Sequence, residues 1–165
     1  MIALAVDEKL VGILVKSTVD GLAMAGLKPV PAGVSKFVLC RQPVSAMVGY
    51  AGPSSGNLLI NTSEAVACFM AGKMVGETFS QLDHQTLDGI CEIANMIAGQ
   101  TKAMLSASEH RVEKLSTPSA IVGANYTISH IRGMTSVAVE FELPEMPIRL
   151  GQASTFAVNL SLIRL

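Results

Sequence analysis

A helical hydrophobic pattern over residues 84–106 constrains the fold of this chain more than any other feature. With about 100° of rotation per residue, one set of mostly apolar side chains falls on a single side of a helix. The set is Leu87, Ile90, Ala94, Ile97, Thr101 and Leu105. Such a stripe is typical of a helix that buries one face against other elements. The pattern therefore predicts one long helix packed on a hydrophobic core.

The side of this helix that faces away from the stripe carries a distinctive set of residues. Glu92 lies almost opposite the stripe, and Asn95 is about 60° from Glu92, so both project from one surface strip and lie within a single turn of each other. The strip also includes Asp88, Met96 and Gly99, and we call these five residues the docking strip. A glycine there leaves room for another surface, where a helix face made only for solubility would carry Lys, Glu or Arg. We therefore expect this face to bind a partner.

The composition limits the remaining possibilities. A chain of 165 residues, half of them hydrophobic and 15% charged, predicts one globular domain over residues 1–165. The net charge of −1 argues against a nucleic-acid partner. Residues 1–15 are apolar but contain Asp7, Glu8 and Lys9, and therefore resemble neither a secretion signal nor a membrane span. We expect a cytoplasmic protein without a membrane partner.

The cysteines point to the same compartment. Cys40, Cys68 and Cys91 are odd in number and widely spaced, so the sequence predicts neither a disulfide framework nor a zinc site. The three histidines share no spacing of a metal site or a catalytic triad, and no cluster of acidic residues suggests a cation site. We expect no metal or cofactor of the protein's own.

The order of elements predicts an α+β fold in which long helices pack on an antiparallel sheet. Helices are expected over 2–26, from the cap candidates Thr62-Ser63-Glu64 to about Gly72, and over 84–106. Strands are expected over 37–41, 44–50, 57–60, 120–122, 126–130, 136–142 and 156–163. A helix followed by strands occurs twice, with Pro29 and Pro118 at comparable points, which is compatible with an internal duplication.

One competing motif is Gly52-Pro53-Ser54-Ser55-Gly56, which matches the Gly-x-Ser-x-Gly pattern of serine hydrolases. A nucleophile elbow needs a strand before it and a helix after it. Residues 57–60 instead continue as a strand, so the motif is predicted to be a hairpin turn.

The block from Glu92 to Gly99, Glu-Ile-Ala-Asn-Met-Ile-Ala-Gly, resembles the signature helix of the CheC/CheX family of chemotaxis phosphatases. That helix carries Glu-x-x-Asn followed by small residues, and the closer match is to CheX. The resemblance spans most of the chain, from the opening helix and the hairpins around a Gly-rich turn to the segments 71–76 and 118–123.

The resemblance implies a hydrolase that dephosphorylates a phosphorylated response-regulator receiver domain of the CheY type, with Glu92 and Asn95 as the functional pair. Magnesium would belong to the receiver. One site per chain is implied, because Glu8 is followed three residues later by Val11 and Glu64 by Ala67, not by Asn. The resemblance also implies a homodimer paired through a sheet edge, for which the apolar runs 136–142 and 156–163 are candidates.

Chemistry assigns the two residues different tasks. An asparagine carboxamide can accept from and donate to an attacking water, and a carboxylate can form a charge-assisted bond with a receiver lysine. An adaptor that binds a receiver or a flagellar switch component through the same face is the alternative function, and it would not require Asn95. Asp88 could instead complement the helix dipole, and Met96 could be core packing.

Overall fold

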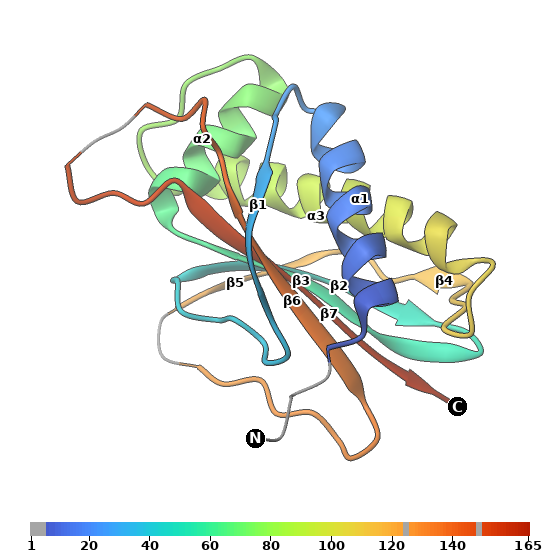
Figure 1. The fold of residues 1–165 in the computed structure, drawn as a ribbon. Helices are drawn as coiled ribbons and strands as arrows, with labels where there is room; N and C mark the ends of the chain where they lie inside the picture. The colour runs from blue at the N-terminus through green and yellow to red at the C-terminus, as the bar shows by residue number, and fades with distance from the viewer. Residues whose placement is uncertain (1–5, 124–125, 148–149) are drawn as a thin grey trace.

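Three helices cover one face of a seven-stranded sheet (Figure 1). This computed structural model describes residues 6–123, 126–147 and 150–165. The helices are α1 Glu8–Ala23, α2 Glu64–Val75 and α3 His84–Leu105. The strands are β1 Val30–Ser35, β2 Val44–Ala51, β3 Ser54–Thr62, β4 Lys114–Leu115, β5 Ser119–Val122, β6 Thr135–Glu142 and β7 Thr155–Arg164. The predicted α+β architecture is confirmed.

The strand order is β1-β6-β7-β3-β2-β4, and β5 also pairs with β2. The strand pairs are antiparallel. Strands β6 and β7 have neighbours on both sides, so the runs 136–142 and 156–163 cannot supply a free edge for a dimer, and that part of the expectation is wrong. In the described part of the chain the outer strands are β1 on one side and β4 with β5 on the other.

The sheet order is symmetric about the β7–β3 pair. With β5 as the outer neighbour of β2 and β4 left out, exchanging β1, β2 and β3 with β5, β6 and β7 reproduces the same order. Pro29 directly precedes β1 and Pro118 directly precedes β5. This arrangement is compatible with an internal duplication, which stays a hypothesis.

The hydrophobic core lies between the helices and the sheet. Alternating residues of β6 and β7 are buried on the face toward the helices, as the period of two requires. These residues are Val137, Val139, Phe141, Phe156, Val158, Leu160 and Leu162. The rings of Phe141 and Phe156, which are partners in the β6–β7 register, stack with centroids 5.4 Å apart. The core-facing stripe predicted for α3 is buried as well, apart from the half-buried Leu87.

Side-chain caps fix where the helices begin. Asp7 accepts from the Leu10 N–H at 3.0 Å, so α1 begins at Glu8; residues 2–5 of the predicted helix lie outside the described residues. Ser63 caps α2 as predicted. The end of α2 differs from the prediction, because the helix continues past Gly72 to Val75 and stops where Gly76 adopts a left-handed conformation at φ +76°.

Two predicted strands are absent from the described residues, and two strands were missed. Residues 37–41 and 126–130 lie outside the sheet ladder. The missed strands are β1 and the two-residue β4. Strand β1 contains Pro31 and Gly33 and has a register irregularity between them. Such residues count against a strand in general, but an outer strand with a bulge tolerates them.

Candidate functional site

Helix α3 is held between α1 and α2 by two places of close backbone approach. Gly21 of α1 lies against Ile97, where an added Cβ atom would meet Ile97 at 3.2 Å. Gly89 of α3 lies against α2, where an added Cβ atom would be 2.6 Å from that of Ala71. These glycines let the helices approach, and the direction in which α3 presents its outer face is therefore set by packing.

Two buried polar contacts fix α3 further. The Tyr50 hydroxyl, from β2 beneath the helix, donates to the Ala98 carbonyl at 3.1 Å. Burial raises the pKa of Tyr50, which keeps this hydroxyl protonated as a donor. The hydroxyls of Thr101 on α3 and Ser17 on α1 lie 2.8 Å apart in a second buried hydrogen bond. Such bonds also satisfy polar groups that would be costly to bury alone.

The docking strip lies on the side of α3 that faces away from the core. Asp88 and Glu92 are exposed, while Asn95, Met96 and Gly99 are half-buried. Glu92 takes part in none of the ion pairs formed among the described residues. The structure therefore brings the five predicted residues together on one surface, as the helical spacing requires.

Gly99 is open on this face, whereas Met96 is partly packed. An added Cβ atom at Gly99 would meet nothing within 4 Å, so this position is open toward solvent. Met96 is half-buried and packs against the hydrophobic core. The core-packing interpretation of Met96 holds for part of its side chain, and the remainder is accessible to a partner.

Asp88 does not have the helix-dipole role that was its alternative. Helix α3 begins at His84, with Asp83 as its N-cap, and has no acidic residue in its first turn. Asp88 lies in the second turn, beyond the region where a carboxylate interacts strongly with the dipole. Burial, with a further effect of the Asp88 charge, raises the pKa of the neighbouring Cys91 thiol, so thiolate chemistry is not expected beside Glu92.

The Gly52–Gly56 motif is a hairpin turn, as predicted. Strands β2 and β3 pair directly around it, and β3 begins at Ser54. The Ser54 hydroxyl is buried and has no hydrogen-bond partner among the described residues. A nucleophile must be accessible and next to a base, so the serine hydrolase hypothesis is wrong.

The sheet face away from the helices carries a polar layer that the sequence analysis did not anticipate. Asn159 on β7 accepts from the Leu39 N–H at 2.6 Å and donates to the Leu39 carbonyl at 3.2 Å. Asn61 on β3 accepts from the Gln42 N–H at 2.9 Å and donates to its carbonyl at 2.8 Å. Two buried asparagines thus hold the segment 38–42 on the sheet. The occurrence of these two asparagines in otherwise apolar strands was the sequence feature that could have indicated this polar layer.

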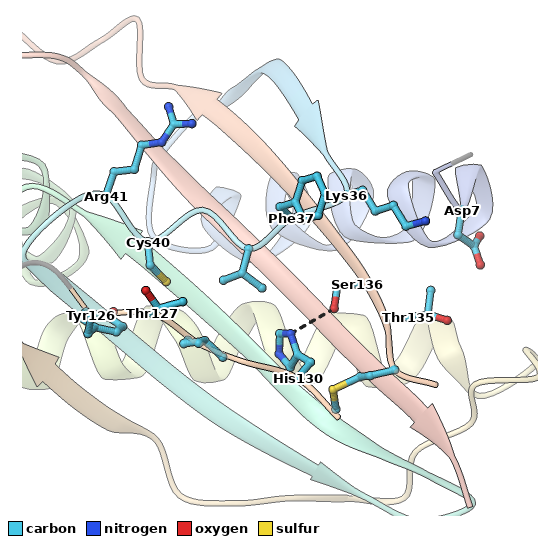
Figure 2. A pocket seen from close by; sticks show the side chains of 13 residues that line it. Asp7, Lys36, Phe37, Cys40, Arg41, Tyr126, Thr127, His130, Thr135 and Ser136 are labelled. Carbon is cyan, nitrogen blue, oxygen red and sulfur yellow. Dashed lines mark hydrogen bonds between the residues drawn. The ribbon is translucent and has the colours of Figure 1, made fainter. Parts of the chain in front are cut away.

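A cavity of about 720 Å³ lies beside this segment (Figure 2). Figure 2 shows Cys40 and Tyr126 near one end and Lys36 with Asp7 near the other, while Arg41 extends away from His130. Burial raises the pKa values of Cys40 and Tyr126, so both groups are neutral at pH 7. The lining carries charges of both signs and selects no single class of ligand. None of the docking-strip residues lines this cavity.

No group of three or more His, Cys, Asp or Glu side chains within the described residues could hold a metal ion. Among the helices described, none is both long and apolar enough to cross a membrane.

Comparisons with known proteins bear on the identity of the chain. Crystal structures similar to it include the chemotaxis protein CheX of Desulfovibrio desulfuricans, at 27% identity and a TM-score of 0.74, with 93% of this chain and 98% of that one covered. A CheC-like superfamily protein from Shewanella sp. PV-4 is 24% identical, with a TM-score of 0.76 and coverage of 93% and 97%. CheX in the CheX–CheY–BeF3–Mg²⁺ complex from Borrelia burgdorferi is 23% identical, with a TM-score of 0.69 and coverage of 97% and 99%.

A search of curated protein sequences gives no match. The family model described as chemotaxis phosphatase CheX matches residues 44–142, which is more than half of the chain. This range contains the strands β2 to β6, the helix α2, and the helix α3 that carries the docking strip and the predicted functional pair. The chain therefore belongs to the CheX family of chemotaxis phosphatases.

Proposed function

We propose that this protein hydrolyses the aspartyl phosphate of a CheY-type receiver domain, with the docking strip of α3 laid across the phosphorylated site. The observation that carries the proposal is the placement of Glu92 and Asn95 on one outward strip of a helix anchored by α1, α2 and β2. The family description names a chemotaxis phosphatase. A relative of the same fold was crystallised with CheY, magnesium and beryllium trifluoride, a mimic of a phosphoryl group.

Asn95 positions the attacking water in this proposal. Phosphoryl transfer passes through a loose transition state, and positioning with charge stabilisation supplies most of the catalysis. The carboxamide offers an acceptor for the water's proton and a donor at the same time, and its state does not change with pH. Asn95 is half-buried, which restricts its rotamers without hiding it.

Glu92 fixes the position of Asn95 relative to the receiver's phosphorylated site. Its exposed carboxylate has no ion-pair partner among the described residues and can bond to a receiver lysine. A charge-assisted hydrogen bond of this kind is directional and fixes how the helix sits. The receiver supplies the magnesium ion. Asp88, Met96 and Gly99 extend the contact surface on either side of the pair.

The alternative is an adaptor that binds a receiver or a flagellar switch component through the same strip without hydrolysis. Glu92 and the open position at Gly99 would serve an adaptor equally well. A carboxamide poised three residues from Glu92 is needed only for hydrolysis. This residue therefore favours the phosphatase.

The test is the loss of phosphate from a labelled receiver in the presence and absence of the protein. We expect the protein to accelerate the loss by at least about tenfold, at amounts well below those of the receiver. Binding of the phosphorylated receiver with no acceleration would favour the adaptor. A protein that neither binds the phosphorylated receiver nor accelerates the loss of phosphate would contradict both functions.

A further inference from the structure

One cationic residue continues the line of the docking strip beyond Gly99. Lys102 follows Asn95 by seven residues, and residues at that spacing share one face of a helix, about 10 Å apart along its axis. Lys102 lies in the last turn of α3 and is half-buried. The side chains of Lys102 and Asn95 therefore leave α3 on the same face.

Lys102 has no carboxylate partner within the described part of the chain. The ion pairs found there are Lys16–Asp20, Arg111–Glu113 and Arg164–Glu109. The strand β5, which packs beside α3, contains no charged residue. A lysine in the last turn complements the helix dipole, which makes this position favourable for Lys102. The interaction leaves the charge of Lys102 available to a partner.

The charges along the outer face of α3 therefore have a fixed order. The carboxylates of Asp88 and Glu92 lie toward the N-terminus, Asn95 and Gly99 are neutral, and Lys102 lies toward the C-terminus. A helix can lie across a partner surface in two opposite directions. With charges of opposite sign at the two ends, only one direction places each charge opposite its complement.

We propose that Lys102 binds a carboxylate on the surface of the docked receiver and so fixes the direction in which α3 lies across it. This inference rests on the proposed function, because it assumes that the docking strip is the receiver-binding surface. It adds a requirement on the partner. The receiver must present a carboxylate roughly 10 Å from the phosphoryl group that Asn95 addresses, on the side away from the lysine that Glu92 binds.

The experiment measures the affinity for a CheY-type receiver loaded with BeF3 and Mg²⁺, at about 25 mM and about 300 mM salt. The variants are Lys102→Glu, which reverses the charge, and Lys102→Gln, which removes it with little change in helix propensity. Lys36→Glu is the matched control, because this exposed lysine lines the cavity on the opposite face of the sheet. Circular dichroism and thermal unfolding verify that each variant is folded.

We expect Lys102→Glu to weaken binding by about tenfold or more at low salt and Lys102→Gln by about threefold, with both losses shrinking at high salt. Lys36→Glu should change affinity by no more than about twofold.

Three results would contradict the inference. Parent-like binding by both Lys102 variants at low salt would show that Lys102 does not bind a receiver carboxylate, even if the parent protein hydrolyses the phosphate normally. An equal loss in Lys36→Glu would show that only net charge matters. A parent protein that neither binds nor dephosphorylates the receiver would overturn the proposed function itself, and the inference with it.

Discussion

A Cβ atom added to Gly89 would lie 2.6 Å from the Cβ atom of Ala71 and 3.3 Å from its Cα atom. Real side chains do not approach so closely, and the backbone of α2 cannot shift cheaply. The same addition at Gly99, ten residues further along α3, would meet nothing within 4 Å. One helix thus contains a glycine required by packing and a glycine that leaves its outer face open.

These two glycines form a matched pair for mutation. Gly89→Ala should destabilise the protein by up to about 2 kcal/mol, because overpacking costs about 1–3 kcal/mol and helix propensity returns only about 1 kcal/mol. Gly99→Ala should stabilise it by about 0.5–1 kcal/mol, since it gains propensity without a clash. Urea unfolding measures both. Equal stability changes would show that the helices do not meet closely at Gly89.

Gly99→Arg separates docking from folding. Arginine is a good helix former, so the variant should keep the helix content of the parent protein. Its long side chain would fill the open position where a partner surface must come close, and receiver binding should be lost. Circular dichroism and a binding titration are the measurements. Parent-like affinity in a folded Gly99→Arg protein would mean that the docking face lies elsewhere.

Asp83 should make the stability of α3 depend on pH. Its carboxylate accepts from the Thr86 N–H at 2.8 Å and from the Thr86 hydroxyl at 2.9 Å, and these bonds lower the pKa of Asp83. A carboxyl whose pKa is lower in the folded state contributes stability above its unfolded pKa, near 4, and loses it as pH falls through the folded pKa.

Asp83→Asn keeps a capping side chain but removes this titration. We expect its free energy of unfolding to fall less steeply than that of the parent protein as pH drops below about 4. Asp83→Ala should be less stable than both at pH 7, since it loses the cap. Thermal unfolding across pH 2–7 is the measurement; parallel curves for parent and Asp83→Asn would contradict the assignment.

A homodimer remains a prediction, now assigned to a different edge. Among the outer strands of the described residues, β1 is longer than β5 and exposes Val30 and Val34. Unpaired edges of this kind invite pairing with another chain. Light scattering should give twice the 17.3 kDa mass of the chain. Val34→Lys should yield a monomer.

Val122 supplies the control for this experiment. It lies on the opposite edge of the sheet and is as exposed as Val34, at 55% against 53%. Val122→Lys should therefore leave the dimer intact. A parent protein that is strictly monomeric at micromolar concentrations would contradict the prediction, and dissociation by Val122→Lys alone would assign the interface to the β5 edge.

Local periodicity was sufficient to predict much of this fold. The stripe from Ile90 to Leu105 fixed the buried face of α3, and strict alternation in Ser136–Glu142 identified β6. Because helical spacing determines which residues share a face, the docking strip followed from the same pattern. These features depend on residues close together in the chain, so no knowledge of distant contacts was needed.

Long-range contacts explain what was missed. Residues 37–41 have the composition of a strand, but side-chain bonds from Asn159 to Leu39, 120 residues away, and from Asn61 to the adjacent Gln42 hold the segment. Strand β1 contains Pro31 and Gly33 and depends on pairing with β6 for its conformation. The sequence around each segment does not report such partners, and tertiary context overrode local propensity in both cases.

Glu92 should contribute to both affinity and rate. Glu92→Ala removes the charge-assisted contact and loosens the register of Asn95, so we expect weaker receiver binding and a lower rate at saturation. Glu64→Ala, which removes an exposed carboxylate from α2, is the control. Hydrolysis measured over a range of protein concentrations separates the two effects. Normal affinity and rate in Glu92→Ala would exclude a register role.

Single-turnover dephosphorylation of a receiver by Asn95→Ala tests the central claim most directly. Gln100→Ala is the control, since it removes a carboxamide from a half-buried position outside the docking strip. We expect Asn95→Ala to bind the receiver with nearly normal affinity and to hydrolyse the phosphate about 100 to 1,000 times more slowly, a loss of about 3–4 kcal/mol in transition-state stabilisation. Gln100→Ala should retain the parent rate. Hydrolysis by Asn95→Ala at the parent rate would contradict the water-positioning role and leave the adaptor as the better account.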